Sequence, residues 1–396
     1  STQIIVTTIQ KLATFVKSHR GHAIYSGHVV LVFDECHRSQ FGDMHTDITR
    51  AFRNYHLFGF TGTPIFAENA SSSGKANLRT TEQAFGDQLH SYTIVDAIRD
   101  KTVLPFRVDY LNSFRVRDGI DNHDVEGIDT DSAYMNPQRI SAVVSYILEH
   151  FDQKTKRHAS FQYKERRVNG FNSLFATSSI KAARAYYQEF KRQQADLPEA
   201  RRLSVGIIYS YAPNAEAPGT GLLSEESMDP SALSQDDRAF LDEAIADYNQ
   251  QFGASFGTDA SGFEGYYTSL STAIAERRID LVIVVDMFLT GFDSKSLNTL
   301  WVDKNLRAHG LIQAFSRTNR ILNSVKTFGN IVCFRNLEEA TNDAIALFGN
   351  KEARGQVLLR PYGEYLSTYL ETIEQLRIGF PLPIGSIASE KEQKRF

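Results

Sequence analysis

Two neighbouring carboxylates are the first residues in this sequence whose placement suggests chemistry. Asp34 and Glu35 directly follow the apolar run His28–Phe33, and His37 comes two residues later. An Asp at the carboxyl end of a sheet strand can hold Mg²⁺ through water, because this ion keeps several of its waters. An adjacent Glu can orient or deprotonate the water that attacks a phosphate. The group therefore favours phosphoryl-transfer chemistry over a plain acidic turn.

Short motifs rich in Thr and Gly end two further apolar runs. Thr61–Pro64 (TGTP) follows Tyr55–Phe60, and Leu289–Asp293 (LTGFD) follows Ile279–Val285. Gly and Pro favour turns, so a plain turn is one interpretation of the first motif. Its small hydroxyl side chains, standing at the edge of a sheet, could instead link the acidic site to another part of the molecule.

Two arginines near the other end of the chain could act on a phosphate. Arg317 and Arg320 lie three residues apart in the helical pattern Leu311–Leu322, and Gln313 lies four residues before Arg317. We therefore expect these side chains on one side of a helix. Two guanidiniums placed in this way suit an arginine finger, which stabilises charge on a transferring phosphate. A solvated basic face is the alternative.

The order of these motifs is more informative than any one of them. Apolar runs alternate with amphipathic helical patterns, which is typical of α/β folds with parallel sheets. The acidic strand end and the first Thr-Gly turn fall in one such region, whereas the second Thr-Gly turn and the arginines fall in another. Chance agreement of all four is small, so together they favour a nucleotide-driven motor.

The remaining patterns complete two lobes. Further strands are expected at Leu174–Thr177, Leu203–Tyr209, Thr299–Val302 and Gly329–Phe334, and helices at Ile180–Gln193 and Asp236–Gln251. Polar segments at 115–136 and 212–230 interrupt the pattern. The expected domains are a first lobe over 1–105, a linker or insertion over 106–138, a second lobe over 139–350 with an insertion near 212–275, and the start of a helical region over 351–396.

Composition limits the class of protein but not its ligand. The 396 residues are 42% hydrophobic and 23% charged, with a net charge of −4, which is typical of a globular chain with sizeable cores. Phosphate contacts need only local Lys and Arg, so this charge neither supports nor excludes nucleic acid. Cys36 and Cys333 form no disulfide framework or zinc pattern, and a reducing cytoplasm fits best. No apolar run of about 18 residues predicts a membrane span.

The motifs together resemble the signature of superfamily 2 helicases and translocases. The matching segments are Asp34–His37 (motif II), Thr61–Thr63 (motif III), Phe175–Ser178 (motif IV), Thr290–Asp293 (motif V) and Gln313–Arg320 (motif VI). Longer strings, such as Phe33–Gly42 and Phe58–Ile65, are similar to the motor (R) subunit of type I restriction enzymes, particularly the type IC branch. This resemblance runs from Ile4 to at least Gly349 and implies two RecA-like lobes, the first truncated at its N-terminus.

The resemblance also implies a reaction and roles for individual residues. ATP would sit between the lobes, with Mg²⁺ held by Asp34 through water and the attacking water positioned by Glu35. Arg317 and Arg320 would reach across from the second lobe, and His37 would couple hydrolysis to lobe movement. Other residues expected at the nucleotide or in this coupling are Thr61, Gly62, Thr63, Gly291, Asp293 and Gln313. Contacts to DNA phosphates are expected from Thr8, Thr177 and Thr290.

As a family member, the chain is expected to work with other subunits on duplex DNA. The resemblance implies ATP-driven DNA translocation beside modification (methyltransferase) and specificity subunits, with cutting by a separate upstream nuclease domain. The phosphate-cradling pattern Gly-x-x-x-x-Gly-Lys-Ser/Thr does not occur in the sequence, which begins at Ser1. We therefore expect a fragment of a longer site-specific deoxyribonuclease that is inactive alone.

Three rival interpretations stay open on the sequence. The short motifs would also fit another superfamily 2 helicase or translocase, from which only the longer strings separate the chain. A non-catalytic motor-like scaffold is a second rival, although the acidic pair and both arginines argue against it. A metal-dependent nuclease built on Asp34, Glu35 and His37 is less favoured, because no Asp/Glu-x-Lys partner strand is visible.

Overall fold

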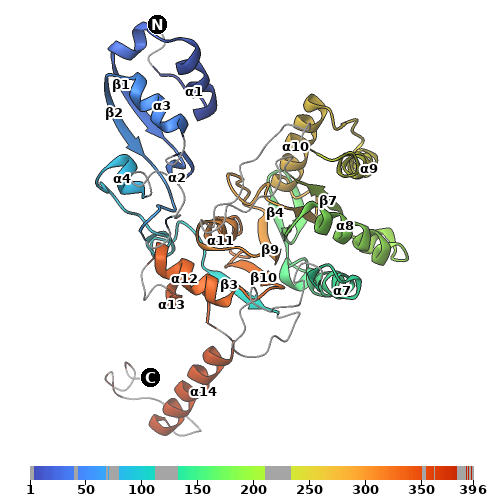
Figure 1. Cartoon of the computed structure of the whole chain (residues 1–396). Coiled ribbons are helices and arrows are strands. Elements are labelled where there is room, and N and C mark those ends of the chain that lie inside the picture. Colours follow the sequence, from blue (N-terminus) through green and yellow to red (C-terminus); the bar gives the residue numbers. More distant parts are fainter. Residues whose placement is uncertain are drawn as a thin grey trace.

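The computed structural model describes most of the chain as two α/β lobes and a terminal helix (Figure 1). The described residues are 4–39, 43–67, 70, 80–111, 133–209, 233–349, 354–360 and 362–380, with 389, 391 and 394. In Figure 1 the first lobe is blue, the second runs from green to orange apart from its cyan edge strand near residue 108, and α14 (Tyr362–Gly379) extends away from both.

The first lobe is built on two parallel strands. β1 (His28–Phe33) pairs with β2 (Asn54–Gly59) along its whole length. The helices α1 (Ile9–Ser18) and α3 (Asp43–Ala51) pack on one face of this pair, where Leu31 joins their apolar side chains in a small core. Other elements described here are η1 (Ala23–Ser26), α2 (Cys36–Ser39), α4 (Thr81–Phe85) and α5 (Ile94–Arg99).

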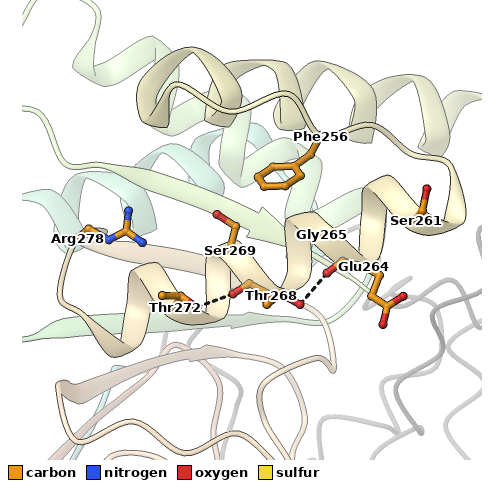
Figure 2. A pocket seen from close by; sticks show the side chains of 8 residues that line it. All are labelled: Phe256, Ser261, Glu264, Gly265, Thr268, Ser269, Thr272 and Arg278. Atoms are coloured by element: carbon orange, nitrogen blue, oxygen red, sulfur yellow. Dashed lines mark hydrogen bonds between the residues drawn. The ribbon is translucent and has the colours of Figure 1, made fainter.

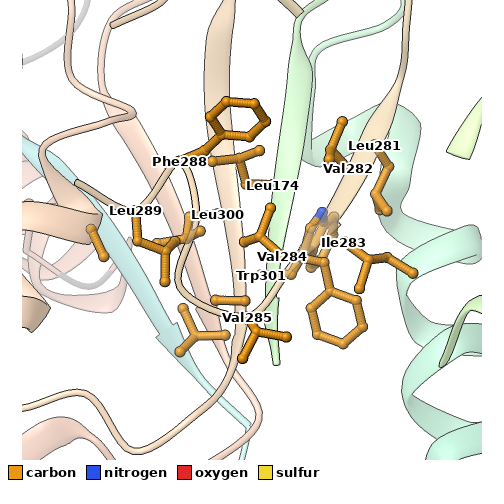
Figure 3. Packing of buried hydrophobic residues seen from close by; sticks show 14 of the residues in the cluster. Leu174, Leu281, Val282, Ile283, Val284, Val285, Phe288, Leu289, Leu300 and Trp301 are labelled. Carbon is orange, nitrogen blue, oxygen red and sulfur yellow. The ribbon is translucent and has the colours of Figure 1, made fainter. Parts of the chain in front are cut away.

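The second lobe contains a six-stranded parallel sheet in the order β3-β10-β9-β6-β8-β7. Its strands are β3 (Phe106–Tyr110), β6 (Asn172–Thr177), β7 (Val205–Ile208), β8 (Leu281–Val284), β9 (Leu297–Asp303) and β10 (Gly329–Cys333). Every residue of β6, β8, β9 and β10 is buried, because helices cover both faces of the sheet. Leu174, Ile283 and Trp301 lie in the resulting core (Figure 3).

Helices of the second lobe begin at capping residues that the sequence supplies. They are α7 (Pro137–Lys154), α8 (Ile180–Gln194), α9 (Gln235–Phe252), α10 (Ala260–Ala275), α11 (Ala308–Phe315) and α12 (Glu338–Phe348). The side chains of Ser179, Ser234 and Asp259 accept backbone N–H groups at the starts of α8, α9 and α10. In Figure 1, α7 and α8 lie on one side of the sheet, and α11 and α12 lie on the other. The hairpin β4 (Ser160–Tyr163) and β5 (Arg166–Asn169), η2 (Glu199–Arg201) and α13 (Arg354–Val357) complete the described elements.

Two of the expected domain boundaries need correction. The range 106–138, expected as a linker, begins with β3, which pairs with β10 at the edge of the second-lobe sheet. The range near 212–275, expected as an insertion, contains α9 and α10, which bury Phe240 and Tyr266 in the main core. The Tyr266 hydroxyl also donates to the carbonyl of Ile207 at 2.6 Å. These segments belong to the lobe because its sheet needs their apolar faces. The polar stretch 212–230 and residues 115–132 lie outside the described residues.

Candidate functional site

The acidic pair stands in solvent at the end of β1. Asp34 and Glu35 are both exposed, and an Asp34 carboxylate oxygen accepts the backbone N–H of Glu35 at 3.0 Å. Glu35 has a φ of 47°, a left-handed conformation that is uncommon outside glycine and is often found at functional sites. Two adjacent exposed carboxylates provide the oxygen ligands, and the access for water, that Mg²⁺ prefers.

Backbone contacts hold motif III beside this pair. The N–H of Cys36 donates to the carbonyl of Phe60 at 3.0 Å, and the N–H of Phe60 donates to the carbonyl of Phe33 at 2.8 Å. A Cβ at Gly59 would lie 2.8 Å from the Cys36 sulfur and equally close to the Phe85 ring. Glycine at this position therefore lets the side chains of Cys36 on α2 and Phe85 on α4 pack against the end of β2.

His37 connects motifs II and III. Its ring is fully buried, and Nδ1 lies 2.7 Å from the hydroxyl of Thr61 and 3.5 Å from a carboxylate oxygen of Glu35. The same Thr61 hydroxyl accepts the backbone N–H of Thr63 at 3.0 Å. These hydrogen bonds hold Thr61 and Thr63 close to the end of β1, whereas Gly62 between them is exposed.

Gln313 on α11 extends this arrangement into the second lobe. Its side-chain nitrogen lies 3.2 Å from the Thr63 hydroxyl and 3.3 Å from Nε2 of His37. An amide NH₂ can only donate, so it donates to the Thr63 hydroxyl and lies within hydrogen-bond distance of Nε2 of His37. We call His37, Thr61, Thr63 and Gln313 the interlobe network. It joins motifs II, III and VI, as the sequence-based coupling hypothesis requires.

The arginines of motif VI do not share a helix face. α11 ends at Phe315, not at Leu322, because the next residues pair with another segment. The carbonyl of Asn319 accepts the N–H of Leu104 at 2.8 Å, and Arg320 forms a bridge with Val103. The expectation of one helix carrying both guanidiniums was therefore wrong.

Both guanidiniums are held by groups of their own lobe. Arg317 donates from Nε to the carbonyl of Gln313 at 3.1 Å, and also donates to the carbonyl of Phe292. Arg320 donates to a carboxylate oxygen of Asp293 at 2.9 Å in a solvent-exposed ion pair. Gly291, which directly precedes Phe292, has a φ of 71°, a left-handed conformation that favours glycine. The bonds of Arg317 to Phe292 and of Arg320 to Asp293 join motifs V and VI.

The three residues expected at DNA differ in exposure. Thr177 is fully buried and its hydroxyl donates to the carbonyl of Val284 at 3.1 Å, and Thr290 is 6% exposed. The Thr177 hydroxyl is not available to a DNA phosphate in this conformation, because it is buried in β6 and already donates within the sheet. Thr8 is exposed at the start of α1, where its hydroxyl accepts the N–H of Lys11 at 3.3 Å.

Sequence reasoning missed a buried ionic cluster at the carboxyl ends of β9 and β10. Asp303 accepts hydrogen bonds from Arg139 at 2.6 Å, Tyr186 at 2.6 Å and Arg335 at 3.1 Å. Burial opposes ionisation of Asp303, but the bond from Arg139 and the charge of Arg335 hold its pKa below the ordinary value. Its position at a strand end was visible in the sequence, whereas its partners come from three other elements.

The second lobe also carries an open groove along α10 (Figure 2). Its volume is about 570 Å³, and it lies between Phe256 and Arg278. The hydroxyls of Thr268 and Thr272 point along the groove but donate to carbonyls of their own helix, at 2.9 and 2.8 Å. The groove shares no lining residue with the interlobe network, so the candidate site is the network and the acidic pair.

Comparison with protein families gives two matches that follow each other along the chain. Residues 1–137 match the family of SWI2/SNF2 ATPases. Residues 169–336 match domain 3 of the type I restriction enzyme subunit R. The two matched segments contain, between them, the acidic pair and all members of the interlobe network. Among the described residues, no helix has both the length and the apolar character that a membrane span requires.

Individual relatives agree with these matches. The endonuclease subunit of the type I restriction enzyme SauMSSORF170P from Staphylococcus aureus (strain MSSA476) is 39% identical over 404 residues, covering 100% of this chain and 40% of the relative. The HindI endonuclease subunit of Haemophilus influenzae is 24% identical over 401 residues, covering 96% of this chain and 34% of the relative. The solved structure of the ATP-dependent type ISP restriction-modification enzyme LlaBIII bound to DNA is similar with a TM-score of 0.42 at 12% identity, over 83% of this chain and 19% of that chain.

The match to the staphylococcal relative, which covers the whole of this chain, and the two family matches agree with the motifs. The chain spans about 40% of the length of the staphylococcal relative. Over its whole length the chain is therefore similar to the endonuclease (R) subunits of type I restriction enzymes, and it carries matches to a SWI2/SNF2 ATPase and to domain 3 of the R subunit in two α/β lobes.

Proposed function

We propose that this chain is the motor segment of an R subunit, which hydrolyses ATP between its lobes to translocate double-stranded DNA. One observation carries the proposal: Gln313 of the second lobe bonds to His37 and Thr63 of the first. Such a contact lets a change at the nucleotide alter the relative placement of the lobes, and repeated closure would move them along DNA.

The first lobe would supply the hydrolytic groups. Asp34 would hold Mg²⁺ through water, and that ion would neutralise charge on the phosphates. Glu35 would orient the attacking water from its exposed position one residue further along. His37 touches Glu35 on one side and Gln313 on the other, so it would relay the state of the site to the second lobe.

The second lobe would supply positive charge in the transition state. Arg320 would exchange its carboxylate partner Asp293 for the γ-phosphate. This exchange costs little, because Asp293 is 63% exposed and surface ion pairs contribute less than about 1 kcal/mol. Arg317, braced by two carbonyls, would approach the nucleotide as α11 moves, with Gly291 providing the turn beside it.

The remaining assignments concern the whole subunit. We propose that it acts with modification and specificity subunits in the cytoplasm, and that DNA is cut by a nuclease domain outside this segment. Thr8, exposed at the N-terminus of α1, is the favoured DNA phosphate contact, since helix N-termini attract anions. We expect the segment alone not to turn over ATP, because it contains no phosphate-cradling Gly-x-x-x-x-Gly-Lys-Ser/Thr pattern.

The deciding experiment is ATP hydrolysis by the full-length subunit, with and without its partner subunits and duplex DNA carrying the recognition site. We expect strong stimulation of ATP hydrolysis only when the partner subunits and the duplex DNA are both present. Glu35→Gln should bind nucleotide but lose turnover, whereas Glu82→Gln, an exposed first-lobe control, should behave as wild type. Stimulation by single-stranded DNA or RNA without partners would indicate a general helicase. No hydrolysis under any condition would indicate a scaffold.

A further inference from the structure

His309 makes a second contact between the lobes, beside that of Gln313. It lies on α11, is fully buried, and its Nε2 is 3.3 Å from the carbonyl of Pro64 at the end of motif III. A carbonyl can only accept, so Nε2 carries the proton and donates. The imidazole also stacks on His37, with ring centroids 5.6 Å apart and an interplanar angle of 23°.

The position of His309 on the helix explains why two contacts matter. His309 precedes Gln313 by four residues, so both point from one side of α11, about 6 Å apart along its axis. A single contact would let the helix pivot about Gln313, whereas two contacts fix its angle to the first lobe. Phe348 of α12 packs edge-to-face with His309, with ring centroids 5.0 Å apart. The imidazole is therefore supported from its own lobe.

The angle of α11 in turn determines where the arginines lie. Arg317 donates to the carbonyl of Gln313, and Arg320 follows five residues after the helix ends at Phe315. A tilt of α11 about Gln313 would therefore displace the guanidinium that motif VI presents to the nucleotide. An arginine finger depends on such placement, because displacement by about 1 Å can cost about a hundredfold in rate.

We propose that His309 is a positioning residue that sets the angle of the second lobe on the turn Thr61–Pro64 and so aligns motif VI for ATP turnover. The inference rests on the proposed function, because it assigns His309 a part in the same reaction. The residue touches neither the acidic pair nor the arginines through any bond described above, and acts through Pro64 and His37.

The test uses the full-length R subunit assembled with its modification and specificity subunits on duplex DNA carrying the recognition site. His309→Phe keeps a ring for stacking but removes the donor, whereas His309→Gln keeps a donor of similar reach. We expect His309→Phe to lower the DNA-stimulated kcat about tenfold with the KM for ATP within twofold, and His309→Gln to recover most of that loss. His158→Phe, at an exposed histidine of the same lobe, should match wild type.

The outcomes separate the two proposals. If the wild-type complex shows no DNA-stimulated hydrolysis, the proposed function fails and the role of His309 fails with it. If the wild type is stimulated and His309→Phe has the wild-type kcat, the positioning role is overturned and the proposed function stands. Equal losses in His309→Phe and His309→Gln would also overturn it, since the hydrogen bond to Pro64 would then have no part.

Discussion

The two lobes differ in how they hold the residues that they bring to the site. In the second lobe every residue of β9 is buried, whereas in β1 only Leu31 is. In the described part of the first lobe one sheet face is packed, and the other exposes Val32 by 62%. The second lobe thus holds Gln313 and His309 on a fully buried sheet, and the first lobe presents its carboxylates to water.

The largest expected effect concerns the reaction itself. Arg320→Ala in the full-length complex should lower ATP turnover by about a thousandfold or more, as loss of an arginine finger does in other phosphoryl-transfer enzymes. The DNA-bound complex should still assemble, because the substitution removes a side-chain ion pair with the exposed Asp293 and leaves the backbone bridge to Val103 in place. Steady-state ATPase rates measure the effect, with Arg201→Ala as a surface control. Near-normal turnover would remove Arg320 from the catalytic set and leave Arg317 as the arginine that the second lobe supplies.

The contrast in burial should appear in the ion pairs of the two lobes. Arg139→Met removes a partner of buried Asp303 and should lower the free energy of unfolding of the second lobe by about 3–5 kcal/mol. Lys17→Met removes an exposed partner of Asp47 and should cost less than about 1 kcal/mol. Urea unfolding would be followed by the fluorescence of the single tryptophan, Trp301, which reports the second lobe, and by circular dichroism, which reports both lobes together. Equal losses would contradict the contrast.

Strand residues sharpen the same comparison on a smaller scale. Val282→Thr places a hydroxyl in the fully buried strand β8 and should cost about 1–3 kcal/mol. Val32→Thr makes the same change on the open face of β1 and should stay within about 0.5 kcal/mol. The two variants differ from wild type by the same atoms, so the difference between their urea midpoints reports burial alone. A large loss at Val32 would show that this face is covered in solution.

A buried lysine should make the stability of the second lobe rise with pH. Burial lowers the pKa of Lys326 to about 7, although its ammonium donates to the carbonyls of Lys295 and Leu297. The unfolded chain keeps this proton to higher pH, so the stability of the wild type should rise between pH 7 and about 10, by at most about 1.4 kcal/mol per pH unit. Lys326→Met should lack this rise. If the urea midpoints of the wild type and of Lys326→Met changed with pH in parallel, Lys326 would not titrate between pH 7 and about 10 in the folded protein.

The sequence by itself determined the order of the motifs and most of the strands, although β3 and the hairpin β4–β5 were not among those expected. His28–Phe33 is a strand with the bounds expected from its apolar run, and the acidic pair stands at its end. The expected strands of the second lobe are all present within about two residues. These features are local, because apolar periodicity and turn chemistry act between residues close in sequence.

Only the tertiary structure decided how the motifs meet. His37 and Gln313 are 276 residues apart, so no local pattern could show that they touch, nor that His309 stacks beside them. The end of α11 at Phe315 was missed for the same reason: its helical pattern continues, but pairing of Asn319 and Arg320 with residues 103–104 offers the backbone other partners. The side chains that act on one another here are selected by the packing of distant segments, which favours a few long-range contacts over the local preference of the chain.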